Sequence, residues 1–186
     1  MSHDKFKVLN NCQRSILAEG LFYDQHRNEL LWVDILGDQI FRYDLTTETT
    51  LSQWHQRTPT CIFPTPTENI YLTSSLRSLL KGDQIIAELP QQSNDLRFND
   101  AKLDRKGRLW IGTMDIHERP RRAGLYRLTN PESEPQPKPK PELELKYSPI
   151  SLSNGIGWSL NGTRMYFIDT PERSVQIFEY DNEQGQ

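Results

Sequence analysis

The sequence predicts an all-β protein of the β-propeller type, and two observations support this prediction. A strand pattern of three apolar residues followed by a small or polar one recurs along the chain. It occurs at residues 31–34, 70–73, 109–112 and 166–169, so its first residues lie 39, 39 and 57 positions apart. Helical periodicity is nearly absent, and short apolar or alternating runs are separated by turn residues. Short strands repeating about every 40 residues are typical of propeller blades.

The first repeat unit contains the four strands expected of one blade. We expect the inner strand at residues 17–23 and the second, rich in β-forming residues, at 30–35. The third is expected at 39–44 and the fourth near 50–55, with polar turns between the strands. Four antiparallel strands within about 40 residues make one blade.

The later units continue this pattern as one domain. The predicted blades cover approximately residues 15–56, 58–90, 96–148 and 151–186. The third is lengthened by a charged loop at 116–123 and by a proline-rich segment at 131–141, which we expect to be a solvated loop because proline lacks an amide donor. The chain therefore holds about three and a half blades, whereas propellers usually close with four to eight. We expect it to be the N-terminal part of a longer protein.

Composition narrows the classes of partner. The 186-residue chain has a net charge of −3, a pI near 5.8 and no basic run, so no nucleic-acid partner is indicated. No apolar run approaches the ~18 residues of a membrane span, and no secretory signal is visible. Cys12 and Cys61 fit neither a zinc motif nor a disulfide framework. We expect a cytoplasmic protein with reduced thiols and no membrane partner; the oligomeric state is not indicated.

Polar residues occupy a repeated position that should face the propeller axis. Glu19 lies twelve residues before Leu31, and Asn154 lies twelve before Tyr166. Asn99 lies ten residues before Leu109. Carboxylate and amide oxygens are suitable ligands for a hard divalent cation such as calcium. The competing interpretation is structural, because a glutamate can stand at a turn and Asn-Gly is a common hairpin dipeptide.

Arg97 and Asn99 are two residues apart and should share one face of a strand. The guanidinium supplies a planar set of donors, and the amide adds a donor and an acceptor. Together they can hold a polyhydroxylated or carboxylated ligand beside the metal. Alternatively, Arg97 pairs with Asp100 or Asp104 at the surface. Strand alternation should turn Asp100 away from Asn99, which favours a structural role for that carboxylate.

Four blocks of this sequence together resemble a known family. They are AEGL at residues 18–21, RFNDAKLD at 97–104, GRLWIGTM at 107–114 and SNGIGWS at 153–159. They are similar to blocks of the gluconolactonase, regucalcin (senescence marker protein) and luciferin-regenerating-enzyme family, and the resemblance covers nearly the whole chain. It implies a six-bladed β-propeller with one divalent metal in its channel and hydrolysis of sugar lactones or related esters.

Residue by residue, the resemblance implies that Glu19 and Asn154 are metal ligands and that Arg97 and Asn99 contact substrate. The family's third ligand, an Asp that is also the proposed general base, is expected beyond residue 186, so no catalytic residue is named here. A substrate-contacting Glu often lies three residues after the methionine of the GTM block. His117 occupies that place with Glu118 beside it; either can serve, and the alternative for both is a solvated loop charge.

The implied function is a divalent-metal-dependent hydrolase of the gluconolactonase type. Calcium or zinc is the expected cation, and magnesium or manganese is compatible with the same oxygen ligands. A metal-activated water would attack the lactone carbonyl after a carboxylate base has removed its proton. Two alternatives remain, a non-catalytic calcium-binding regulatory propeller and an inactive truncated copy. The presence or absence of a metal-ligating Asp beyond residue 186 would distinguish the lactonase from the calcium-binding propeller. Whether these 186 residues fold alone would test the truncated copy.

Overall fold

The computed structural model describes residues 8–9, 11–91, 94–129 and 140–186, and these form four antiparallel sheets in chain order. The first sheet contains β1 (Ala18–Asp24), β2 (Glu29–Asp34), β3 (Gln39–Asp44) and β4 (Thr49–His55). The second contains β5 (Ile62–Pro64), β6 (Tyr71–Ser75), β7 (Ser78–Lys81) and β8 (Gln84–Glu88). The third contains β9 (Leu96–Leu103), β10 (Leu109–Asp115), β11 (Ala123–Leu128) and β12 (Leu143–Ile150). The fourth contains β13 (Ser153–Trp158), β14 (Arg164–Asp169) and β15 (Ser174–Glu179).

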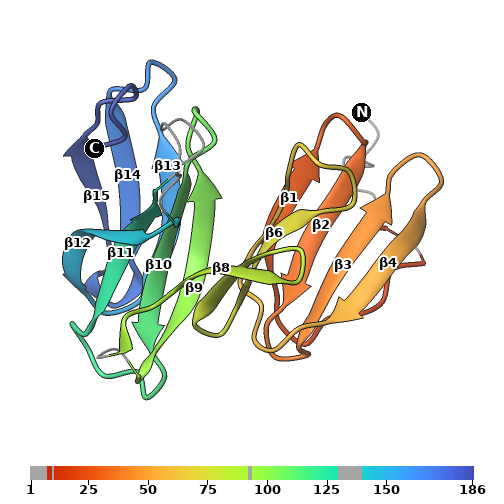
Figure 1. Ribbon diagram of the computed structural model, residues 1–186, viewed down its shortest axis with the longest axis horizontal. Coiled ribbons are helices and arrows are strands. Elements are labelled where there is room, and N and C mark those ends of the chain that lie inside the picture. The colour runs from red at the N-terminus through yellow and green to blue at the C-terminus, as the bar shows by residue number, and fades with distance from the viewer. Residues whose placement is uncertain (1–7, 10, 92–93, 130–139) are drawn as a thin grey trace, which may run out of the picture.

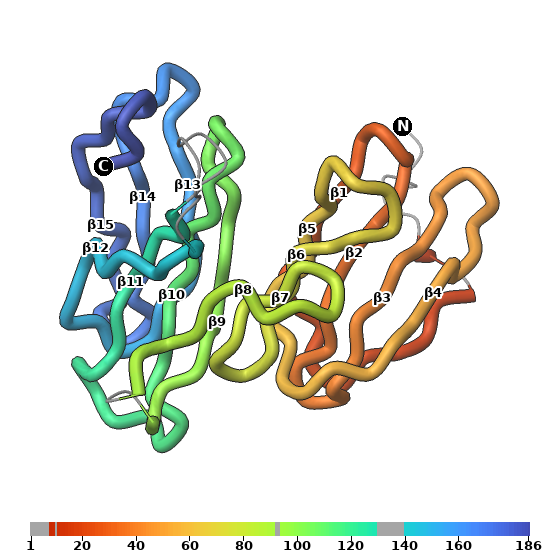
Figure 2. The backbone as a smooth tube through the Cα atoms, in the orientation of Figure 1, coloured from red at the N-terminus to blue at the C-terminus, as the bar shows by residue number. Residues whose placement is uncertain are grey.

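The sheets are arranged as blades of a β-propeller, which confirms the predicted fold class. Figure 1 shows β1–β4 on one side of the molecule and β9–β15 on the other, and Figure 2 shows residues 181–186 far from the first sheet. One short 3₁₀ helix, η3 (Thr170–Glu172), follows β14. Most of the proline-rich loop expected at 131–141 lies outside the described residues, which omit 130–139. No helix in the described part of the chain has the length and apolarity to cross a bilayer.

Burial along the strands follows their place in each blade. All seven residues of β10, which lies between the second and fourth sheets, are buried, as are five of the six in β2. One face of β2 packs on the second sheet, and the other is covered by Leu9 and Cys12 from the segment before β1. The outermost strands β4 and β15 instead alternate between exposed and half-buried residues. This is the period of two expected where one face of a strand meets solvent. Two of the four apolar runs that identified the strands, residues 31–34 and 109–112, are thus buried throughout.

Three clusters of the hydrophobic core form layers that lie between consecutive sheets. The layer between the first and second sheets is formed by Leu31, Val33, Ile35, Ile40, Ile62 and Tyr71. The layer between the second and third includes Phe63, Leu79, Phe98 and Ile111. The layer between the third and fourth includes Trp110, Leu125, Ile156, Phe167 and Tyr180. Each large side chain buried in a layer contributes about 1.5–3 kcal/mol of transfer free energy.

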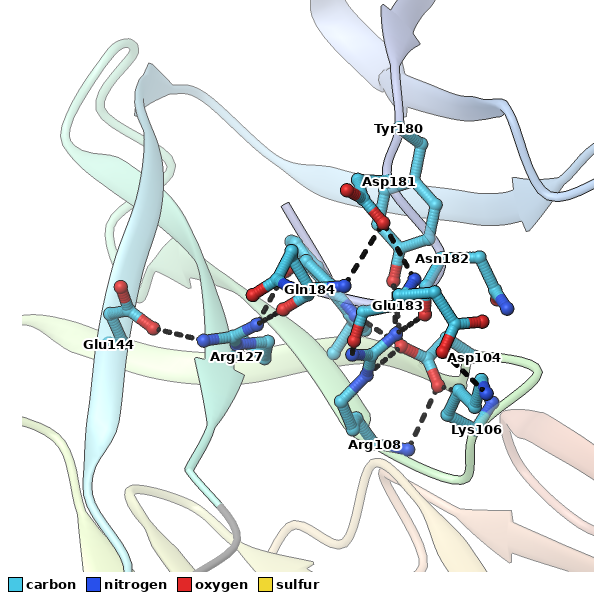
Figure 3. A network of polar contacts seen from close by, with 12 residues as sticks. Asp104, Lys106, Arg108, Arg127, Glu144, Tyr180, Asp181, Asn182, Glu183 and Gln184 are labelled. Atoms are coloured by element: carbon cyan, nitrogen blue, oxygen red, sulfur yellow. Dashed lines mark hydrogen bonds and ion pairs between the residues drawn. The ribbon is translucent and has the colours of Figure 1, made fainter.

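A polar network fastens residues 181–186 to the third sheet (Figure 3). The Asp104 carboxylate accepts hydrogen bonds from the Tyr180 hydroxyl at 2.7 Å and from Arg108 Nε at 2.6 Å. Arg108 also donates to two backbone carbonyl oxygens of the 181–186 segment, at 2.6 and 3.0 Å. Arg127 donates to two more, both at 2.6 Å. Four carbonyl groups that follow the last strand are therefore paired with two arginines.

Replacing Tyr180 by phenylalanine should lower the free energy of unfolding by about 1–2 kcal/mol at pH 7, because Asp104 loses one of its donors. Burial and the bond to Asp104 raise the pKa of Tyr180 to about 12. Because the pKa of Tyr180 is higher in the folded protein than its unfolded value near 10, the protonated hydroxyl stabilises the fold. This stabilisation is complete below pH 10 and is lost as the pH rises from about 10 to about 12. Denaturant unfolding at pH 7 and pH 11 measures both effects. Tyr166→Phe on β14 is the control, and equal stability of Tyr180→Phe and wild type at pH 7 would contradict the proposed role.

The third and fourth sheets approach each other closely at Gly112. A Cβ atom at this position would lie 1.7 Å from Ser153 Oγ, so Gly112→Ala should destabilise the protein by about 1–3 kcal/mol. Removing the obstacle in the double variant with Ser153→Gly should recover part of this loss. Gly157→Ala is a matched control, because a Cβ there meets no atom within 4 Å. Thermal melts of wild type and the three variants test this prediction. A melting temperature of Gly112→Ala equal to that of wild type would contradict the close contact with Ser153.

Candidate metal and substrate site

Three inner strands are interrupted by a bulge at equivalent places, next to the predicted polar residues. The pairing of β1 with β2 shifts after Glu19, and the pairing of β13 with β14 shifts after Asn154. The pairing of β9 with β10 shifts between Phe98 and Ala101, where Asn99 lies. A bulge bends a strand and re-aims its side chains. The spacing that aligned Glu19, Asn99 and Asn154 in the sequence therefore corresponds to a repeated irregularity in the sheets.

Side chains near these bulges line one cavity of about 240 Å³ that contacts residues of all four blades. Its lining is Leu17, Glu19, Gly20, Ile35, Thr60, Arg97, Asn99, Asp100, Met114, Glu118, Leu152 and Asn154. Five of the six predicted site residues thus lie at one cavity. The sixth, His117, is exposed and is not part of this lining.

A chain of hydrogen bonds joins three of the predicted residues. Arg97 Nη1 donates to Asn99 Oδ1 at 3.2 Å. Asn99 Nδ2 donates to the Ser153 carbonyl at 2.8 Å and to Asn154 Oδ1 at 3.1 Å. Asn154 Nδ2 in turn donates to Thr170 Oγ1 at 2.7 Å. The two amides of the site are therefore held in fixed orientations by neighbours on both sides.

Arg97 is free of the surface ion pairs considered from the sequence. Within the described residues its guanidinium forms no ion pair, and Asp104 pairs with Arg108 instead. Burial lowers the pKa of Arg97, with Glu118 opposing that shift. One guanidinium nitrogen donates to Asn99 and to the Phe98 carbonyl at 2.8 Å, and the others remain available to a ligand.

Asp100 was expected to point away from the site, and the structure places it at the same cavity as Asn99. The expectation assumed unbroken strand alternation, which the bulge between Phe98 and Ala101 interrupts. Burial raises the pKa of the Asp100 carboxyl, although the amide of Ala101 donates to it at 2.8 Å. The sequence contained one signal for this placement. Asp100 directly follows Asn99, at the position where glycines follow Glu19 and Asn154. Asp100 adds a third carboxylic acid to the lining, beside Glu19 and Glu118.

The loop after β10 carries Glu118 to the cavity. Arg119 donates to both carboxylate oxygens of the fully buried Asp115, with Nη2 to Oδ2 at 2.7 Å and Nε to Oδ1 at 3.1 Å. The hydrogen bonds from Arg119 hold the pKa of Asp115 at about 2. The amide of Glu118 donates to the Asp115 carbonyl at 2.9 Å, and Glu118 has a positive φ of 57°. Asp115 thereby fixes the turn that separates Glu118 from His117.

The oxygen groups of the cavity fit a hard cation. Glu19 offers a carboxylate, and Asn154 Oδ1 accepts one hydrogen bond and keeps a second lone pair. Such oxygens, completed by water, are ligands of calcium and magnesium. In the described ranges, no group of three or more His, Cys, Asp or Glu side chains is arranged to hold a metal ion. Glu19 and Asn154 alone would therefore supply only part of a coordination shell.

Comparison with known proteins gives a consistent family match. Residues 17–186 match the sequence pattern of the SMP-30/Gluconolactonase/LRE-like region. A Bacillus subtilis protein named provisionally as the sugar lactone lactonase YvrE is 30% identical over 96% of this chain and 60% of its own length. Regucalcin of Danio rerio is 27% identical over 93% of this chain and 58% of its length. The structure of a luciferin-regenerating enzyme superposes with a TM-score of 0.81 at 23% identity, covering 92% of this chain and 58% of that one. The chain spans about 60% of the length of these relatives.

Arg119→Gln should release the loop at residues 116–122, because Asp115 loses its main partner. Trypsin cleavage after Arg121 and Arg122, followed by mass spectrometry, should then become several-fold faster, since proteolysis reports local opening. Pro120 blocks cleavage after Arg119 itself, so the variant removes no tryptic site. Arg105→Gln, in an exposed turn of the same sheet, is the control. An unchanged cleavage rate in Arg119→Gln would show that the Asp115–Arg119 pair does not hold the loop.

Proposed function

The chain belongs to the SMP-30/gluconolactonase/LRE-like family, and on that premise we propose that it forms the metal- and substrate-binding part of a divalent-metal-dependent lactonase acting on sugar lactones. The observation that carries the proposal is the single cavity at which Glu19 and Asn154 meet Arg97 and Asn99. Potential cation ligands and potential hydroxyl-binding groups thus share one small volume. The lactonase name of the Bacillus relative supports the same class of substrate.

Glu19 and Asn154 are the proposed protein ligands of the cation, for which calcium and zinc are the first choices and magnesium and manganese the next. A bound cation would polarise the lactone carbonyl and lower the pKa of a water molecule. The oxygen-only ligand set suits calcium, and zinc also accepts carboxylate oxygens. Asn99 uses both amide hydrogens within the protein, so we propose that it holds Asn154 in addition to its expected contact with substrate.

Arg97 and Glu118 are the proposed contacts to the sugar. The guanidinium donates hydrogen bonds and the carboxylate accepts them, so the pair can bind two hydroxyl groups of a polyol. Orientation of this kind raises the rate by proximity. Of the two residues considered for this contact, we propose Glu118 over His117, because Glu118 lines the cavity and His117 does not. None of the described residues is assigned the role of general base, and the third ligand remains an expectation about residues beyond 186.

Glu19→Gln should weaken calcium binding by at least tenfold, because a charged ligand is replaced by a neutral one. Isothermal titration calorimetry with calcium and zinc measures the affinity, and the rise in melting temperature on adding each ion checks it independently. The matched control is Glu68→Gln, which removes an equal charge from an exposed loop. Glucono-δ-lactone hydrolysis, followed by acid release at constant pH, tests turnover.

Three outcomes separate the hypotheses. Metal binding with lactone hydrolysis that Glu19→Gln abolishes would support the lactonase. Metal binding without hydrolysis would favour the non-catalytic calcium-binding alternative for this chain. Absence of metal binding in a cooperatively folded wild-type protein would rule out the proposed site.

A further inference from the structure

The amide of Asn154 has a problem of orientation that the carboxylate of Glu19 does not have. A carboxylate presents an oxygen whichever way it rotates, whereas an amide presents either an oxygen or an NH₂ group. Only the oxygen can bind a cation. A site that uses Asn154 as a ligand therefore needs neighbours that determine which end of the amide faces the ion.

The hydrogen-bond partners determine this orientation without ambiguity. Arg97 can only donate and the Ser153 carbonyl can only accept, so Asn99 must turn its oxygen to Arg97 and its nitrogen to Ser153. The same nitrogen faces Asn154, which must then present Oδ1 to it. The NH₂ group of Asn154 is thereby directed to Thr170 Oγ1 at 2.7 Å.

Thr170 is itself held in place by the strand that carries Asn154. Its amide donates to the Leu152 carbonyl at 3.1 Å, two residues before Asn154. The preceding residue, Asp169, accepts the amides of Ser151 and Leu152, each at 2.9 Å. The hydroxyl of Thr170 is thus attached to the same backbone segment from which the Asn154 side chain projects.

The first sheet offers an internal comparison. There the amide of Ile35 donates to the Leu17 carbonyl at 3.0 Å, the bond equivalent to that between Thr170 and Leu152. Ile35 has no polar group in its side chain, and the ligand position two residues after Leu17 is Glu19. The fourth sheet therefore has a hydroxyl, that of Thr170, beside the Asn154 amide, whose orientation matters. The first sheet has no hydroxyl at the equivalent Ile35, beside the Glu19 carboxylate, which binds a cation in either orientation.

We propose that Thr170 is a positioning residue that holds the Asn154 NH₂ group away from the cation and so presents Asn154 Oδ1 to it. This inference rests on the proposed function, because it concerns the same metal site. Partners behind a metal ligand typically change metal affinity by 10–100-fold when they are removed. Thr170 acts through Asn154 and is not assigned a contact with metal or substrate.

The test uses the full 186-residue chain and calcium alone as the probe. Thr170→Val keeps the shape of the side chain and removes the hydroxyl, so calcium affinity measured by calorimetry should fall about tenfold. Thr170→Ser keeps the hydroxyl and should bind calcium within about twofold of wild type. Melting temperatures without calcium show whether all variants are folded.

A second pair of variants separates positioning from general structure. Asn154→Asp replaces the amide by a carboxylate, which needs no orientation. In that background Thr170→Val should change calcium affinity by no more than about twofold, whereas a purely structural role would cause the same loss in both backgrounds.

Two results would overturn the inference, and they are distinguishable. Calcium binding by wild type that Thr170→Val leaves unchanged would refute the role of Thr170 and leave the proposed metal site intact. No calcium binding by the folded wild-type chain would refute the metal site together with the role of Thr170.

Discussion

Buried carboxylates that accept backbone amides are the interaction on which the site depends. Asp34, at the end of β2, accepts the amides of Ile16 and Leu17, each at 2.8 Å. Asp169 repeats this arrangement at the end of β14. Burial alone would raise the pKa of Asp34, but its backbone donors outweigh burial and lower it. An ionised group can be buried at acceptable cost only when it is bonded in this way, so each aspartate fixes the chain just before a potential metal ligand.

The bulges that follow these fixed segments bring the side chains of the site together. After Glu19 and after Asn154 the chain meets a glycine with positive φ, of 61° at Gly20 and 44° at Gly155. The extra residue breaks strand alternation, so neighbouring side chains of one strand can reach the same cavity. The regular parts of the sheets provide stability through the layers between them. The irregular parts determine which side chains meet.

Much of the fold and part of the site were accessible from the sequence. The four expected strands of the first blade, residues 17–23, 30–35, 39–44 and 50–55, each lie within one residue of β1 to β4, because period-two burial and turn residues are local signals. The alignment of Glu19, Asn99 and Asn154 was also visible, since equal spacing along equivalent strands implies equal places in the sheets.

The remaining features depend on contacts between distant segments or on backbone shape. Asp100 reaches the cavity only because of a bulge that spacing does not reveal. Thr170 meets Asn154 across sixteen positions of chain. The choice between His117 and Glu118 depends on the turn fixed by Asp115 and Arg119, whose partnership is not encoded in any motif. In each case the backbone path had to be known before the side chain could be placed.

The layered core has a further consequence for how this protein would respond to a ligand. Each hydrophobic layer joins two consecutive sheets, so a disturbance in one sheet is passed on chiefly through its immediate neighbour. The cavity is different, because its lining includes residues from all four blades. A molecule bound there would contact the first and fourth sheets directly. The four sheets, otherwise joined only to their neighbours, would then unfold more cooperatively, as in a closed structure.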